Sequence, residues 1–334
     1  MSRLTAVARA IVDRVRAAAP AVPLDVEIHV PIGPTPAFFT MLHYFAAGLR
    51  LNGGSLAGSR IVATVGADCE PEDLSERLPW TRKYGIEWRW LDRDLYRRHI
   101  YYATAVERFR HPFRARMVML LDVDTFVTGE FRPVVESCSR GRALAGLIAH
   151  VSPFSGLGMP TPLWWSRLFR TAGLPPPRLV AEHTGWGTMS HEPADRYCPP
   201  YFNLGALIAP AAIMTQIGSI IYAEMAHVDS VVEIVYKCQL ALALAIQRLG
   251  LSWLPLAMRY NFPNREDLAA RYTDDLADVR LFHYLRQDQV ERTRDFASPQ
   301  HVASLLARDD LNAVNLEMAR RLAPIHEAVL ADPS

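Results

Sequence analysis

The sequence predicts an α/β protein with an open, mostly parallel sheet flanked by helices and with further helices at its carboxyl end. Three observations predict this class. From residue 25 onward, short apolar runs alternate with amphipathic segments of helix length. One run, Met117–Leu121, leads directly into two carboxylates, as a buried strand does when it ends at a ligand-binding edge. The chain has 334 residues, 50% of them hydrophobic, so it can bury a large core.

The first half of the chain predicts four strands joined by three helices. Branched apolar residues mark the strands, and the run Asn52-Gly53-Gly54 ends the first helix. The expected elements are a strand over 25–31, a helix over 38–51, a strand over 60–65, a short acidic-led helix over 71–78, a strand over 86–91, a long helix over 94–109 and a strand over 117–121. This order implies right-handed crossovers and a doubly wound open sheet.

The second half begins less regularly. The alternating pattern loosens after residues 146–150. Residues 151–200 are rich in proline and glycine and predict a long loop region that faces an acceptor substrate. The later elements are a strand over 201–209, a helix from 211, a helix over 229–249, short strands over 253–258 and 279–284, and two amphipathic helices over 299–331.

Composition excludes some classes of protein. The net charge is +1, without a dense basic run, so we expect no nucleic-acid partner. The four cysteines have no CxxC spacing and predict buried thiols in a reducing compartment. Residues 1–24 predict a surface helix rather than a signal peptide, and hence a cytoplasmic protein.

One uncharged segment, 197–223, is long enough to cross a bilayer. Its prolines and glycines divide it into a strand and a helix that Pro210 opens. We therefore expect no membrane span, while peripheral association with a membrane stays open.

The carboxylates after the fourth strand are the strongest functional signal. Val123 separates Asp122 from Asp124 and continues the strand pattern, which would point both carboxylates to the same side. Two oxygen ligands at this edge suit a hard divalent cation that keeps open positions for a phosphate substrate.

Two later motifs complete a recognisable set. Leu121-Asp122-Val123-Asp124 is followed by Tyr201-Phe202-Asn203-Leu204-Gly205 and then by Phe282-His283-Tyr284. In this order the motifs resemble the nucleotide-sugar-dependent glycosyltransferases of GT-A fold, most closely the retaining family of glycogenin and the bacterial lipopolysaccharide galactosyltransferases. The resemblance covers roughly residues 25–285.

The resemblance implies a hexosyltransferase. It would move a sugar from a nucleoside-diphosphate sugar, with UDP favoured, to a hydroxyl of a glycan, lipid-linked or small-molecule acceptor. Asp122, Asp124 and His283 would hold Mn²⁺ or Mg²⁺ against the diphosphate, and the anomeric configuration would be retained. It also divides the chain into an N-terminal helix (1–24), a nucleotide-sugar-binding half (25–150), an acceptor-binding and metal-completing half (151–290) and C-terminal helices (291–334).

The remaining site residues follow from the resemblance position by position. Pro31, Ile32 and Gly33 follow the first strand and would lie under the nucleotide base, and Arg108 would hold phosphate.

Further along the chain, Asn203 and Gly205 would line the sugar pocket. Gln239 would lie near the sugar and the acceptor. Cys238 stands where the family has an acid, which leaves the donor sugar and the handling of the acceptor open.

Three alternatives stay open. In a haloacid-dehalogenase-like phosphatase, Asp122 would be the nucleophile, Asp124 the acid/base and Asp274-Asp275 the acidic pair. Against it, a long α/β stretch precedes the motif and the only later lysine is Lys237.

The second alternative is a non-catalytic sugar-nucleotide-binding protein, which the departure at Cys238 would favour. The third is a structural zinc site from His183, His191 and Cys198, whose spacing fits no common pattern.

Overall fold

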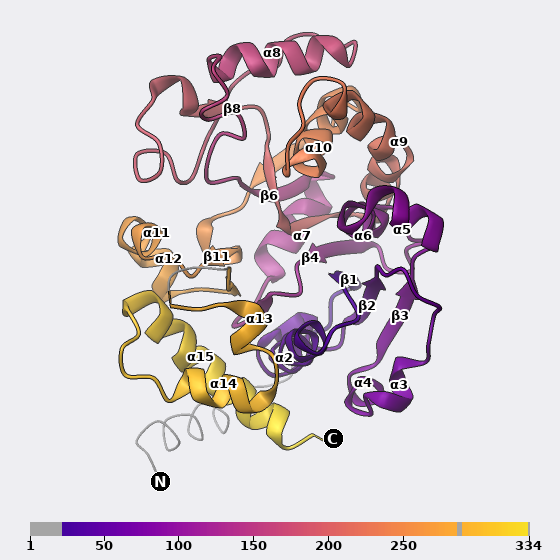
Figure 1. Cartoon of the computed structure of the whole chain (residues 1–334), viewed down its shortest axis with the longest axis vertical. Coiled ribbons are helices and arrows are strands. Elements are labelled where there is room, and N and C mark those ends of the chain that lie inside the picture. The colour runs from indigo at the N-terminus through magenta and orange to yellow at the C-terminus, as the bar shows by residue number, and fades with distance from the viewer. Residues whose placement is uncertain (1–21, 286–288, 333–334) are drawn as a thin grey trace.

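The structure is a computed structural model that describes residues 22–285 and 289–332 (Figure 1). Most of the N-terminal helix expected over 1–24 lies outside the described residues.

The central sheet has seven strands in the order β10-β6-β9-β4-β1-β2-β3. Their bounds are Trp253–Pro255, Leu144–Ile148, Phe202–Pro210, Met117–Leu121, Val26–Ile32, Arg60–Val65 and Ile86–Trp90. All neighbouring pairs are parallel except those of β9, which is antiparallel to both β4 and β6. The carboxyl ends of β1, β4 and β6 and the amino end of β9 therefore meet at one edge, where the acidic motif lies.

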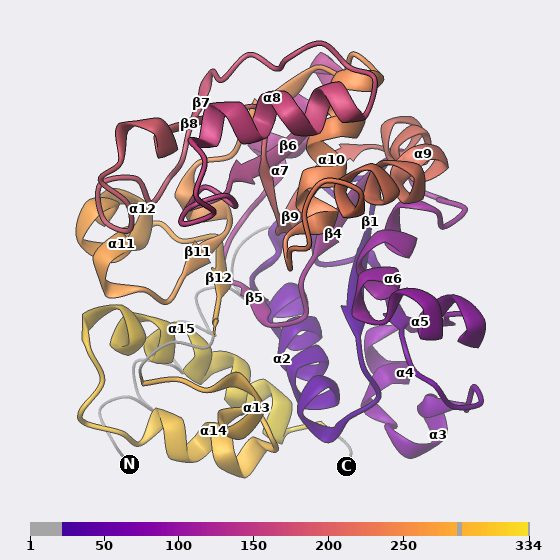
Figure 2. The same cartoon turned by 45° about the horizontal axis from the view of Figure 1, so that its top comes forward.

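Helices cover both faces of the sheet because its central strands are apolar on both sides. Along β4, Met119 packs into one core with α2, whereas Val118 and Leu120 pack into the other with α9 and α10. Figures 1 and 2 show α2, α14 and α15 on one side and α9 and α10 on the other. The longer helices are α2 Pro36–Asn52, α7 Arg132–Gly141, α8 Thr161–Thr171, α9 Ala211–Asp229, α10 Lys237–Arg248, α14 Pro299–Leu306 and α15 Ala313–Leu330.

A second, three-stranded sheet brings the end of the chain back to the acidic motif. It consists of β5 (Thr125–Val127), β12 (Leu281–His283) and β11 (Phe262–Pro263). β12 is antiparallel to β5, with His283 opposite Thr125. This pairing places His283 beside the two aspartates, although it lies 158 positions after Thr125 in the chain.

The remaining elements are short. They are the paired strands β7 (Ala181–Glu182) and β8 (Tyr197–Cys198), the α-helices α3 Leu74–Arg77, α4 Trp80–Tyr84, α5 Arg93–His99, α6 Tyr101–Val106, α11 Glu266–Arg271, α12 Thr273–Ala277 and α13 Arg292–Asp295, and the 3-10 helices η1 Gly54–Leu56, η2 Glu107–Phe109, η3 Pro193–Asp195 and η4 Met258–Tyr260.

Two helix predictions were wrong. The helix expected over 94–109 is broken at Ile100, whose φ of 47° is incompatible with a continuing helix, so α5, α6 and η2 replace it. The helix expected over 229–249 begins only at Lys237, because α9 continues through Asp229 and residues 230–236 connect the two helices. Val235 and Tyr236, which lie inside the expected range, are exposed in that connection.

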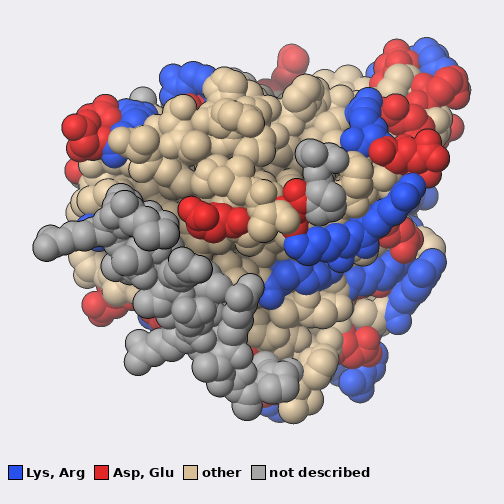
Figure 3. Space-filling model, turned by 90° about the horizontal axis from the view of Figure 1, so that it is seen from below, with Lys and Arg blue, Asp and Glu red and all other residues tan. Residues whose placement is uncertain are grey.

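The loop region expected over 151–200 contains the helix α8, so that prediction was wrong in part. Two other predictions were confirmed. The uncharged segment 197–223 forms β8, β9 and most of α9, and the tail forms two helices. Among the described residues, no helix combines the length and apolarity that a bilayer span requires. On the face in Figure 3, a short band of basic side chains lies beside acidic ones among large uncharged areas, which agrees with the balanced net charge.

Candidate active site

Asp122, Asp124 and His283 converge at the carboxyl edge of β4. Each offers a ligand atom within 4.8 Å of the other two. Asp124 and His283 are buried, whereas the Asp122 side chain is 29% exposed, so the group opens to solvent on one side.

The reason for this convergence differs from the predicted one. β4 ends at Leu121, and residues 122–124 form a tight bend before β5 instead of continuing the strand. The Thr125 hydroxyl donates to the Asp122 carbonyl oxygen at 2.7 Å and helps to close this bend.

Arg108 holds the Asp122 carboxylate from behind. Its guanidinium is fully buried, and Nη2 lies 3.4 Å from Asp122 Oδ1. Nη1 donates to the Leu121 carbonyl oxygen and Nε to that of Ala105, both at 3.0 Å. Burial lowers the pKa of Arg108 and the charge of Asp122 raises it. Arg108 therefore fixes the bend and the carboxylate together.

Asp124 is paired with two residues from the far end of the chain. Arg292 Nη1 forms a short ion pair with Asp124 Oδ2, and His283 Nε2 lies 3.4 Å from Asp124 Oδ1. Arg292 was not among the predicted site residues. Arg292 lies on the four-residue helix α13, whose sequence carries no motif. Only its position in the fold identifies this residue.

A chain of hydrogen bonds fixes the tautomer of His283. The Gly205 N–H donates to Asn203 Oδ1 at 2.7 Å, so this atom is an oxygen that accepts. Asn261 Nδ2 donates to the same oxygen at 3.0 Å, which turns Asn261 Oδ1 toward His283 Nδ1, also at 3.0 Å. An amide oxygen only accepts, so Nδ1 of the neutral ring carries the proton and Nε2 keeps a lone pair.

That lone pair faces the Asp124 carboxylate oxygen, so two acceptors face each other in a buried position. Burial lowers the pKa of His283, which opposes protonation, although the charge of Asp122 raises it. A divalent cation would satisfy both acceptors. Two carboxylates and one imidazole nitrogen fit such an ion, and the nitrogen ligand favours Mn²⁺ over Mg²⁺.

Gly205 is required where it stands. A Cβ atom added there would lie 2.7 Å from Asn203 Oδ1 and 2.7 Å from His283 Cε1. Any side chain would therefore displace Asn203, His283 or both.

The structure places the predicted nucleotide loop at the carboxyl end of β1. Ile32 is 2% exposed, and its carbonyl oxygen accepts from the Gly66 N–H, so it has little left to offer a ligand. Pro31 and Gly33 are partly exposed.

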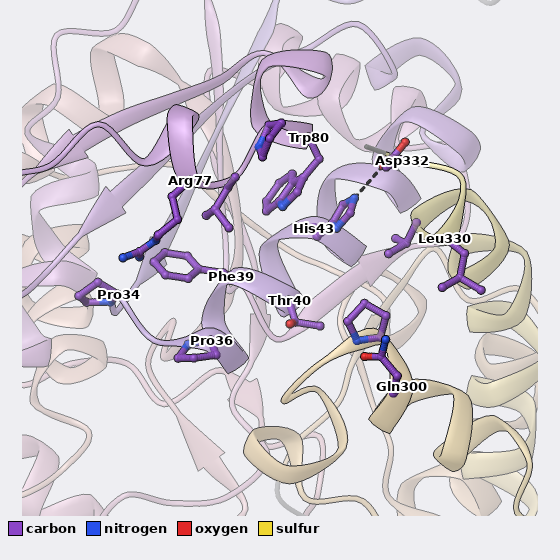
Figure 4. Close-up of a pocket in the computed structure, with 14 residues that line it drawn as sticks. Pro34, Pro36, Phe39, Thr40, His43, Arg77, Trp80, Gln300, Leu330 and Asp332 are labelled. Atoms are coloured by element: carbon purple, nitrogen blue, oxygen red, sulfur yellow. Dashed lines mark hydrogen bonds and ion pairs between the residues drawn. The ribbon is translucent and has the colours of Figure 1, made fainter. Parts of the chain in front are cut away.

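Pro34, the next residue, lines a cavity of 690 Å³ between α2, α4 and the C-terminal helices. Arg77 stands at one end and the His43–Asp332 pair at the other (Figure 4). No described residue of the acidic site lines this cavity.

Gln239 lies in the first turn of α10. Its Oε1 atom is buried and has no hydrogen-bond partner among the described residues. Cys238 beside it is buried near Arg108: burial raises the pKa of the thiol to about 12 although the charges of Lys237 and Arg108 lower it. The Cys-Gln pair thus lies close to the residue that holds Asp122.

His150 is a further residue near the site that was not predicted from the sequence. It follows β6 at the same sheet edge, and the Thr184 hydroxyl, 2.6 Å from its Nδ1, donates to the Ile148 carbonyl oxygen. Burial lowers the pKa of His150 to about 4. It is therefore a neutral imidazole near the site, and as a lone histidine it had no motif to mark it.

The alternatives gain no support from these positions. Asp275, part of the acidic pair that a phosphatase would use, is bonded to Arg259 Nε at 2.6 Å. Among the described residues, the groups that could hold a metal do not include His183, His191 and Cys198 together.

Comparisons with known proteins agree with this architecture. No protein-family model matches the chain, and no curated protein matches it significantly. Among solved structures, the galactosyltransferase LgtC in complex with donor and acceptor sugar analogs superposes with a TM-score of 0.52 and 15% identity, covering 92% of this chain and 98% of LgtC. An active-site mutant of LgtC gives a TM-score of 0.54 and 14% identity with the same coverage. The chain therefore has the GT-A fold that its motifs predict.

Proposed function

We propose that the protein transfers a hexose from a nucleoside-diphosphate sugar to an acceptor hydroxyl with the help of a divalent cation. One observation carries the proposal. The hydrogen-bond chain from Gly205 to His283 sets an imidazole lone pair against Asp124 and beside Asp122, at the ligand-binding edge of a glycosyltransferase fold.

The site residues divide into metal ligands and residues that orient those ligands. Asp122, Asp124 and His283 would hold Mn²⁺, which when bound supplies Lewis-acid stabilisation of the leaving diphosphate. Arg108 orients Asp122, and Asn261 orients His283. Because Arg108 and Asn261 hold these ligands in place before the substrate binds, the ligands need not reorganise as charge develops on the phosphate.

The sugar and the acceptor would lie toward α10. The unpaired Gln239 Oε1 can accept a hydrogen bond from a sugar hydroxyl, and the exposed rings of Tyr101 and Tyr236 are available to a glycan, lipid-linked or small-molecule acceptor. The preference for UDP, the retention of configuration and a cytoplasmic location rest on the sequence motifs and composition.

A screen of sugar nucleotides tests the proposal. Purified protein with Mn²⁺ should release nucleoside diphosphate from at least one of them, and EDTA should abolish the release. Binding without release would support the non-catalytic alternative. Hydrolysis of p-nitrophenyl phosphate with no release of nucleotide would support a phosphatase, and either result would overturn the transferase.

A further inference from the structure

A second group of metal-ligating side chains lies away from the acidic site. Glu27, His29 and His111 each offer a ligand atom within 4.8 Å of the other two. Glu27 and His29 alternate along the amino-terminal half of β1 and point to the same face of the sheet. His111 reaches them from the connection between η2 and β4, where its neighbours Arg110 and Pro112 are exposed.

The partners of the two histidines fix both tautomers. His29 Nε2 lies 2.9 Å from Glu27 Oε1, and a carboxylate accepts, so Nε2 carries the proton and Nδ1 keeps the lone pair. His111 Nδ1 lies 3.0 Å from the Pro112 carbonyl oxygen, so Nδ1 carries the proton and Nε2 keeps the lone pair. Each ring therefore presents one free nitrogen lone pair.

The lone pair of His29 has no partner. His29 is 0% exposed, and its Nδ1 has no hydrogen-bond partner among the described residues. A buried acceptor without a donor is costly, and such atoms are rare in native proteins. The ring of His111 lies next to it, with centroids 5.0 Å apart. A metal ion held by both rings would satisfy the buried lone pair of His29.

We propose that His29 and His111 bind a borderline divalent ion of the zinc class. Imidazole nitrogen suits Zn²⁺, Cu²⁺ and Ni²⁺ better than Mg²⁺ or Ca²⁺. Glu27 orients His29 through Nε2–H, the carboxylate–histidine–metal arrangement that raises the basicity of a ligating ring. This site is distinct from the proposed Mn²⁺ site in both its residues and its ligand type.

The charges around the cluster permit a cation. Burial raises the pKa of Glu27, but the hydrogen bonds from His29 and from the Arg114 N–H outweigh this effect and lower the pKa to about 2. The carboxylate is therefore ionised. Arg60 pairs with Glu27 at 2.8 Å but also with Glu87, and thus neutralises only part of the negative charge. Burial lowers the pKa of His29 and that of His111, which keeps both rings neutral and able to bind metal.

Zinc titrations of metal-free protein test the site. Calorimetry with Zn²⁺ alone should show that Asp124→Asn retains a zinc site and that His111→Ala weakens this site at least tenfold. His111 is the better position to change because it lies on a surface connection, whereas His29 is in the core. The exposed His301→Ala is the matched control and should leave zinc binding unchanged.

Two outcomes would overturn the proposal: equal zinc affinity of His111→Ala and His301→Ala in the Asp124→Asn background, or no zinc binding at all in that background. Thermal melts of the metal-free variants show whether each one folds. Loss of Mn²⁺-dependent nucleotide release with zinc binding intact would concern the transferase proposal alone.

Discussion

The acidic residues at the end of β4 face different partners, and this makes their roles separable. Asp122 is held by the buried Arg108, and Asp124 by Arg292 and His283. Asp122→Asn and Asp124→Asn should each lower transfer at least a hundredfold, a loss of about 3 kcal/mol of transition-state stabilisation. Nucleotide release at saturating Mn²⁺ measures this loss, and full activity of both variants without added metal would refute the metal assignment.

Asn261 should act through His283 rather than on the substrate. Asn261→Ala removes the acceptor of the Nδ1 proton and frees the ring to rotate, so the Mn²⁺ concentration for half-maximal activity should rise about tenfold to a hundredfold. Asn315→Ala is the matched control, because Asn315 is also a buried asparagine and bonds to Asn264 instead. Both variants should lose stability, but only Asn261→Ala should change the metal requirement. Equal metal requirements would assign Asn261 a structural role only.

His150 should make the protein sensitive to acid. Its folded-state pKa is about 4, below the ordinary 6.5, so between these values the unfolded chain binds more protons and stability falls as the pH falls. The loss between pH 7 and pH 5 should be about 2 kcal/mol. Urea unfolding at both pH values should show that His150→Gln removes most of this difference, since the other histidines are common to both proteins. An unchanged difference would mean that His150 is not buried as a neutral ring.

At the scale of the element, α10 matters because its first turn brings Cys238 and Gln239 toward Arg108. Gln239→Ala should reduce turnover more than nucleotide affinity, because its unpaired oxygen would contact the sugar and not the base. Gln247→Ala, at the other end of α10 and bonded to the Pro175 carbonyl oxygen, is the matched control.

The same turn predicts the effect of restoring the acid. Cys238→Asp would place a carboxylate next to Arg108 that competes with Asp122 for the guanidinium and accepts hydrogen bonds from sugar hydroxyls. The ranking of donors in a sugar-nucleotide panel should change. If Gln239→Ala and Cys238→Asp both keep the turnover and the donor ranking of the native protein, α10 is not part of the active site.

Elements with a strong local signal were predictable from the sequence, and those set by distant contacts were not. β4 was predicted with its observed bounds because its five residues are all apolar, as expected for a strand that is buried on both faces. The break at Ile100 was not, since no glycine or proline marks it. The start of α10 was misplaced because Val235 fits the helical period yet lies in the connection after α9.

At the scale of the molecule, the candidate site could be read only in part for the same reason. Motif order predicted Asp122, Asp124 and His283 as site residues, and the pairing of β5 with β12 brings them together. Arg292 and His150 reach the site through the fold alone. Their sequence neighbours carry no pattern that points to a ligand. These two residues can be assigned to the site only once the pairing of distant segments is known.

That long-range pairing predicts a whole-molecule response to ligand. Because the proposed metal ligands come from the bend between β4 and β5 and from β12, an ion that binds them would link segments that are far apart in the unfolded chain, and it would bind only the folded protein. Mn²⁺ at a hundred times its Kd should stabilise the fold by about 2.7 kcal/mol, raising Tm by roughly 4 °C. UDP should raise Tm further in the presence of Mn²⁺ and much less in the presence of EDTA, since its diphosphate would contact the ion. His283→Ala should lose both shifts while His301→Ala keeps them. Equal stabilisation by UDP with Mn²⁺ and with EDTA would place the nucleotide away from the three ligands.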